Sequence, residues 1–121
     1  MLINLSNHPT DLWNEKQLLS AVSKYGIIVE LPFPAISPKA TKRLVEIKAN
    51  VYAKVCIELI KLSQSKNNAV HIMGELTFTY LVVFLLKKNN ITCIASTTER
   101  NAIEYSGKKI SRFNFVKFRE Y

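Results

Sequence analysis

Polar side chains that can hold a phosphate or move a proton gather in three short segments of this sequence. Each segment follows a stretch with the composition of a β-strand, and the three comprise Ser6–Thr10, Gly74–Thr79 and Ser96–Arg100. In a parallel sheet the carboxyl ends of the strands meet at one edge, and ligands bind outside that edge. We therefore expect the three segments to lie together and to form one site.

The segment Ser-Thr-Thr-Glu-Arg at residues 96–100 carries the strongest chemical signal. Hydroxyls and backbone N–H groups can hold phosphate oxygens. The guanidinium of Arg100 can clamp a phosphate through two parallel hydrogen bonds and stabilise charge that grows in a transition state. Ser96, Thr97 and Thr98 would then position the phosphate. The alternative for these three hydroxyls is local hydrogen bonding within a turn.

The first segment contains a histidine among hydrogen-bonding neighbours. Histidine exchanges protons near neutral pH, so His8 could act as a general acid or base. Ser6, Asn7 and Thr10 would contact the ligand from the same loop. The alternative is that His8 is a turn residue held before Pro9.

The central part of the chain predicts a strand, a tight turn and a buried helix. Ala69–Met73 is short, apolar and β-prone, Gly74 permits a sharp turn, and the apolar run from Leu76 is too long for another strand. A helix N-terminus favours phosphate, so we expect Gly74, Glu75 and Thr77 to border the site. The alternative is that Glu75 only complements the helix dipole. We interpret His71, inside the predicted strand, as a core or sheet histidine whose hydrogen bonds are satisfied within the fold.

The other hydrophobic patterns alternate between strands and helices. Further strands are expected at Met1–Leu5, Ile27–Leu31 and Ile91–Ala95. Helices are expected from a capping box at Asn14 and Gln17 to the C-cap Gly26, and from Ser37 and Pro38 to about Ser63. In the tail, Ala102–Tyr105 and Ile110–Phe118 flank Ser106-Gly107-Lys108-Lys109, which predicts a hairpin with a bulge or face switch.

These elements predict one three-layer α/β domain over residues 1–121, with a mostly parallel sheet and a C-terminal β-hairpin. A chain of 121 residues is typical of one domain, and 48% hydrophobic residues can fill a core. No apolar run reaches the ~18 residues of a membrane span, and no signal peptide is evident. We therefore expect a cytoplasmic protein without membrane contact.

The charged residues and the cysteines limit the kinds of partner and site that the sequence favours. The net charge of +8 favours an anionic partner such as a nucleotide or nucleic acid, although a basic surface can simply aid solubility. Cys56 and Cys93 are expected as buried free thiols, and no metal-ligand spacing or cofactor motif is present. No Ser/His/Asp order or carboxylate pair stands out for ester or sugar hydrolysis.

Read together, the motifs resemble those of the Rossmann-like, CARF-related ring nucleases of type III CRISPR systems. The similarity lies in Leu5–Thr10, Met73–Tyr80, Ser96–Arg100 and Phe115–Tyr121. The order of these motifs and the closing Phe-x-x-Phe-Arg-x-Tyr pattern carry the most weight. The family's first motif is closer to Ser-His-x-Leu-Thr, whereas here Asn7 separates Ser6 from His8.

This resemblance implies a Rossmann-like, CARF-like fold and a ligand, cyclic oligoadenylate, with cyclic tetra-adenylate as the expected ring. The protein would be a metal-independent phosphodiesterase that opens the ring and so switches off antiviral signalling. The adenosine 2′-OH would attack its adjacent phosphate, with Arg100, Thr98 and His8 as catalytic residues. Because related sensor domains bind the ring across a two-fold axis, a homodimer is expected.

Two other functions remain open at this stage. A sensor or sponge would hold the ring without cutting it and would use the same residues. A general nucleic-acid-binding protein would use the basic tail, but the sequence lacks the RNP, KH and helix-turn-helix signatures of such proteins.

Overall fold

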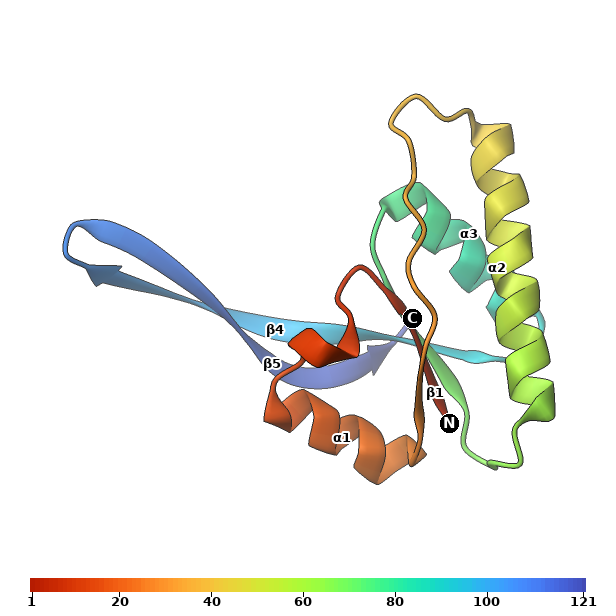
Figure 1. Cartoon of the computed structure of the whole chain (residues 1–121), viewed down its shortest axis with the longest axis horizontal. Coiled ribbons are helices and arrows are strands. Elements are labelled where there is room, and N and C mark those ends of the chain that lie inside the picture. Colours follow the sequence, from red (N-terminus) through yellow and green to blue (C-terminus); the bar gives the residue numbers. More distant parts are fainter.

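A five-stranded sheet with helices on both faces forms the body of the computed structural model, which describes residues 1–121 (Figure 1). The strand order is β2-β1-β3-β4-β5. The strands are β1 Leu2–Ser6, β2 Ile28–Glu30, β3 Ala69–Met73, β4 Thr92–Tyr105 and β5 Lys108–Glu120. The first four pair in parallel, and β5 runs antiparallel to β4. The predicted α/β class is therefore confirmed, and β3 occupies the expected interior position.

Three α-helices cover the sheet, with α2 and α3 on one face and α1 on the other (Figure 1). They are α1 Glu15–Tyr25, α2 Lys42–Leu62 and α3 Leu76–Lys88, and a short 3-10 helix, η1, spans Thr10–Leu12. None of these helices combines the length and apolar character that crossing a membrane requires.

Strand side chains alternate between the two faces of the sheet, which divides the core into two clusters. The larger cluster joins Ile3, Leu5, Val70 and Ile72 to the inner sides of α2 and α3. The smaller cluster joins Leu2, Ala69 and Ile94 to Trp13, Ala21 and Tyr25. The face toward α1 thus has the thinner apolar cover.

The predicted boundaries of α1 are confirmed by its caps. The Asn14 side chain accepts a hydrogen bond from the backbone N–H of Gln17 at 2.9 Å. Gly26 ends the helix with φ of 81°, a conformation that costs little only for glycine.

The predicted start of α2 at Ser37 is wrong. The helix begins at Lys42, where Thr41 caps it by accepting from the backbone N–H of Leu44 at 3.2 Å. Ser37 instead accepts from the N–H of Lys39 in a turn. The physical reason is that the preceding segment stays extended, which lets Phe33 and Ile36 pack against the larger core cluster.

The predicted end of the fourth strand at Ala95 is also wrong. β4 continues through Ser96–Arg100 to Tyr105, paired with β5 along this whole extension. A β-branched Thr-Thr pair suits a strand as well as a loop, and the C-terminal segment supplies its pairing partner. The third polar segment is therefore not a loop. Together β4 and β5 form a two-stranded ribbon that projects from the body (Figure 1).

Two local features shape this ribbon. The loop Ser106-Gly107 has φ of 50° and 76°, as a type I′ hairpin turn requires. A bulge lies where Thr97 pairs with Lys117 and Thr98 with Phe115, so Val116 has no partner. The hairpin and the bulge are both as the sequence predicts. Because of the bulge, Phe115 and Phe118 lie on one face with ring centroids 4.9 Å apart.

Candidate functional site

A pocket of about 380 Å³ lies between the loop after β1, the start of α1 and the root of the ribbon. Its lining comprises Asn7, His8, Leu12, Asn14, Gln17, His71, Met73, Ser96, Thr98, Phe113 and Phe115. These residues supply hydroxyl, amide, imidazole and aromatic groups, and none of them is a carboxylate or a Lys or Arg. Such a surface donates hydrogen bonds to an anion without repelling it.

The polar residues beneath the pocket come from three neighbouring strands. Asn4 and Ser6 on β1, His71 on β3 and Ser96 on β4 share the sheet face toward α1. His71 is in register with Asn4 and with Ile94, and Ser6 and Ser96 each lie two residues beyond those partners on their own strands. All four are connected by hydrogen bonds. These polar residues stand at positions where a buried strand usually carries apolar side chains.

The hydrogen bonds define the protonation of His71. The Nδ2 of Asn4 donates to the backbone oxygen of His8 at 3.1 Å and to Glu30 at 2.9 Å, so its Oδ1 is the acceptor that faces His71. His71 Nδ1 therefore carries the hydrogen and donates to Asn4 Oδ1 at 2.8 Å. His71 Nε2 is then free to accept from the Ser96 hydroxyl at 2.7 Å.

Burial keeps His71 neutral. Only 1% of the residue is exposed, and the loss of hydration, aided by the nearby His8, lowers its pKa from 6.5 to about 4. The rings of Trp13 and Phe118 pack edge-on against the imidazole, with centroids at 5.1 and 5.6 Å. The imidazole thus has a fixed orientation and an unprotonated Nε2 at pH 7. The expectation that His71 is a satisfied sheet histidine is confirmed, and it also lines the pocket.

The loop after β1 is held by its backbone, which leaves side chains free for the pocket. The backbone oxygen of His8 accepts from Asn4 Nδ2 at 3.1 Å and from Trp13 Nε1 at 2.8 Å. Asn7 and His8 line the pocket. Ser6 lies beneath the pocket, and its hydroxyl donates to Asn4 Oδ1 at 2.7 Å. The Thr10 hydroxyl donates to a carboxylate oxygen of Glu30 at 2.7 Å.

The second predicted segment lies apart from this pocket. Glu75 caps α3 by accepting from the backbone N–H of Thr77 and of Phe78, at 3.1 and 2.8 Å, and from the Thr77 hydroxyl. The Phe78 N–H and then the Thr77 hydroxyl lower the pKa of Glu75. The N-terminus of α3 is therefore occupied by the chain's own carboxylate. A Cβ on Gly74 would come within 2.3 Å of the Phe33 ring, so this glycine permits close packing.

Because side chains along β4 alternate between the two faces of the sheet, the residues of the third predicted segment do not all reach the pocket. Ser96 and Thr98 line the pocket, whereas Thr97 points to the other side and bonds the backbone of Lys117 at the bulge. Arg100 lies farther out on the ribbon face that carries Thr98. Its guanidinium donates to Ser111 Oγ at 3.2 and 3.0 Å and lies 5.9 Å from the centre of the Phe113 ring.

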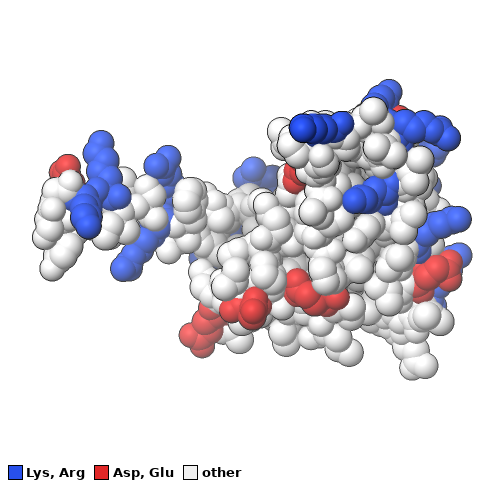
Figure 2. Space-filling view, turned by 45° about the horizontal axis from the view of Figure 1, so that its top comes forward, with Lys and Arg blue, Asp and Glu red and all other residues white.

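The ribbon adds positive charge beside the pocket. Figure 2 shows Lys and Arg side chains spaced along it. From Thr97 to Lys117 the ribbon carries five of them, Arg100, Lys108, Lys109, Arg112 and Lys117, against Glu99 and Glu104. An anion at the pocket would therefore experience attraction from the ribbon.

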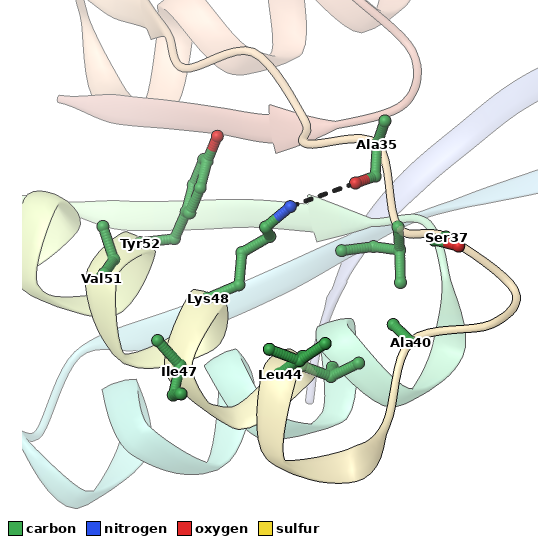
Figure 3. Close-up of a pocket in the computed structure, with 10 residues that line it drawn as sticks. Ala35, Ser37, Ala40, Leu44, Ile47, Lys48, Val51 and Tyr52 are labelled. Atoms are coloured by element: carbon green, nitrogen blue, oxygen red, sulfur yellow. Dashed lines mark hydrogen bonds between the residues drawn. The ribbon is translucent and has the colours of Figure 1, made fainter.

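A second cavity, of about 480 Å³, lies between residues 35–40 and α2 (Figure 3). Its lining is mostly apolar, with Leu44, Ile47 and Val51 on one side and Ala40 on the other. The Lys48 ammonium crosses it to the backbone oxygen of Ala35 at 3.3 Å. The cavity contains no imidazole or carboxylate. No group of three or more His, Cys, Asp or Glu side chains gathers as a metal site elsewhere.

Comparison with protein families assigns the chain to one family. The model of the Uncharacterized protein MJ1673 family matches residues 1–119. The chain belongs to this family. The match includes every residue of the pocket and of its polar network. Neither the search of curated proteins nor the search of solved structures found a match.

Residues that the sequence reasoning left out of the site include Asn4, Gln17, His71, Phe113 and Phe115. A signal for two of them was present: Asn4 and His71 are polar residues within strongly apolar strands. The aromatic pair had no such signal, because its position depends on the bulge at Val116.

Proposed function

We propose that this chain binds cyclic oligoadenylate at the pocket beside Ser96 and opens the ring without a metal, and that it is a Rossmann-like ring nuclease of the CARF-related kind. The observation that carries the proposal is the pocket itself. Hydroxyl, amide and imidazole groups converge there with no carboxylate, at the root of a basic ribbon. This surface suits a phosphate that is bound through neutral donors in a positive field.

The ribbon offers contacts for the rest of a nucleotide ligand. The ring of Phe113 is 65% exposed and lines the pocket, so an adenine can stack on it. Arg100 lies beside that ring and has a planar fork suited to phosphate. Thr98 lies between the pocket floor and Arg100 on the same strand face. The ligand would therefore extend from Ser96 outward along the ribbon.

The size of the pocket favours a two-fold assembly. A cavity of about 380 Å³ lies near the lower end of the ~300–1,000 Å³ range for ligand sites, and suits part of a cyclic oligonucleotide better than a whole ring. Two copies related by a two-fold axis would supply two pockets to a symmetric ring. An isolated two-stranded ribbon is marginally stable, so contact with a second copy would also support the ribbon.

A hydroxyl nucleophile can open the ring without a metal. The adenosine 2′-OH, expected from the sequence, would leave a 2′,3′-cyclic phosphate and a 5′-hydroxyl. A protein hydroxyl would instead take the phosphoryl group onto itself and release a phosphate monoester after hydrolysis. In the first route His8, which lines the pocket, would exchange a proton with the reacting oxygens.

The test is incubation of the purified protein with labelled cyclic tetra-adenylate, with and without EDTA. Linear product in both samples supports the proposal. Loss of cleavage in EDTA alone would contradict the metal-independent chemistry, and absence of both binding and cleavage would rule out this ligand.

A sensor or sponge is the second candidate, and one observation favours it. Ser96, His71 and Asn4 already satisfy one another with hydrogen bonds, as in a rigid binding surface. The same incubation separates the two functions, since a sponge returns the ring intact. Binding to duplex DNA in place of the ring would instead favour a nucleic-acid-binding ribbon, because a two-stranded ribbon fits the major groove.

A further inference from the structure

We propose that Ser96 is a nucleophile for phosphoryl transfer, with the His71 imidazole as its proton acceptor and Asn4 as the residue that holds the imidazole in place. The identity of the phosphate ester rests on the proposed function. The reactivity of the Ser96 hydroxyl does not, and it can be measured without a nucleotide.

Three distances support this role. The Ser96 hydroxyl lies 2.7 Å from His71 Nε2, and His71 Nδ1 lies 2.8 Å from Asn4 Oδ1. Both are within the ~2.6–3.2 Å that a nucleophile, its base and an orienting group require. The third distance, 3.0 Å, is from Gln17 Nε2 to Ser96 Oγ, and this donor stabilises the oxygen as its proton leaves. Such a constellation is defined by geometry and not by sequence order.

The position of Ser96 makes its hydroxyl accessible. The pairing of β3 with β4 ends at His71 and Ile94, so β4 is free of β3 at Ser96. Its backbone N–H contacts the sulfur of Met73 at 3.2 Å. Both residues line the pocket, but Ser96 is partly exposed whereas only 1% of His71 is exposed. A phosphate in the pocket therefore meets the hydroxyl first.

The buried imidazole suits both halves of the reaction. With a pKa of about 4, His71 is neutral at pH 7 and its Nε2 can accept the hydroxyl proton. Burial lowers the pKa of the resulting imidazolium, which favours transfer of that proton to a leaving alkoxide. Asn4 orients the ring without adding a negative charge, so the imidazolium is not retained.

The step balances with water as the only further reactant. The Ser96 Oγ–P bond forms, the P–O bond to the leaving ribose oxygen breaks, and the hydroxyl proton passes through His71 to that oxygen. The intermediate is a phosphodiester between Ser96 and the opened nucleotide. Water then attacks its phosphorus and gives a proton to His71, the Oγ–P bond breaks, and the phosphate stays on the ribose as a monoester. Ser96 recovers its proton from His71. The linear product thus carries a phosphate monoester and a free hydroxyl, and not a 2′,3′-cyclic phosphate.

The experiment treats the native protein with a fluorophosphonate, whose P–F bond is broken by an activated serine. Trypsin cuts after Lys88 and Arg100, and Ser96 is the one serine in the peptide between them. We expect one adduct on this peptide by mass spectrometry. It should form at least ~100-fold faster than in urea-unfolded protein, the lower scale for general base assistance.

Two variants complete the test. Ser96→Ala should give no adduct on this peptide, and Ser23→Ala, which removes an exposed serine of α1, should react like the wild type. The presence or absence of an adduct on the wild-type peptide tests the proposal even if Ser96→Ala does not fold. No adduct on the natively folded wild type, or a ring product that ends in a 2′,3′-cyclic phosphate, would overturn the inference alone. Labelled Ser96 in a protein that neither binds nor opens the ring would overturn the proposed function and leave the inference standing.

Discussion

His71 donates from Nδ1 to the amide oxygen of Asn4 at 2.8 Å, and the two residues are direct register partners in the β1–β3 pair. The bond therefore joins two strands in the interior of the sheet. With the second bond, from Ser96 on β4, polar contacts cross three adjacent strands on one face. A shift of β1 or β3 by one residue would separate these partners and move them to opposite faces, so the site depends on the strand register.

The stability of the protein should fall on mild acidification because of His71. Its folded pKa of about 4 lies below the ordinary 6.5, so the unfolded chain binds more protons between these values. The free energy of unfolding therefore decreases as pH falls from 6.5, by about 2 kcal/mol at pH 5. Urea denaturation at pH 5, 6 and 7 measures this slope. His71→Asn should flatten the slope, whereas His8→Asn, which removes only the smaller cause of the shift, should retain most of it. An unchanged slope in His71→Asn would assign the effect to another group.

Gly74→Ala should destabilise the protein through Phe33. The new Cβ would come within 2.3 Å of the Phe33 ring, which packs edge-on against Phe78 at 5.2 Å. Displacement of that ring should cost about 1–3 kcal/mol. In a double-mutant cycle, Phe33→Ala should remove most of the cost of Gly74→Ala, because the clash is then absent. Additive effects of the two substitutions would show that the strain lies in the backbone.

Arg100→Lys should remain folded and lose about 100-fold in single-turnover opening of cyclic tetra-adenylate. Lysine keeps the charge but lacks the planar fork, and loss of one such donor is worth ~2–4 kcal/mol in a transition state. Circular dichroism checks the fold.

Lys108→Ala, near the ribbon tip, is the matched control for Arg100. It should weaken capture of the ring mildly and in a salt-dependent manner, because long-range attraction is screened. Wild-type cleavage by Arg100→Lys together with an inactive Lys108→Ala would place the phosphate contact at the tip.

The two cysteines should resist thiol reagents in the native state. Cys56 and Cys93 are buried free thiols, and burial raises their pKa to about 12 and about 11. Ellman's reagent at pH 8 should therefore give almost no signal until guanidinium is added, and then two thiols per chain. Rapid reaction of either thiol in native protein would indicate local opening of α2 or β4 on the time scale of the assay.

Local patterns in the sequence were sufficient for most elements of the fold. The apolar run at Ala69–Met73, the capping pair Asn14 and Gln17, and the Gly107 hairpin turn each depend on neighbours within a few residues. Such signals are carried by the chain itself, since propensity, capping and turn geometry act over one or two turns of backbone. The alternation of elements then led to the α/β class.

The start of α2 and the end of β4 required the tertiary structure. Ser37 and Thr41 are both good helix caps, and packing of the extended segment before α2 decided between them. Ser96–Arg100 has the composition of a loop or of a strand. It became a strand because β5, distant in sequence, pairs with it.

The candidate site was decided by long-range geometry. Asn4, His71 and Ser96 are separated by many residues, and no spacing in the sequence relates them. Parallel pairing of three strands and the two-residue alternation of their side chains place them on one face beneath one pocket. The sequence could therefore supply the chemical groups, but only the register of the folded sheet could determine which of them meet.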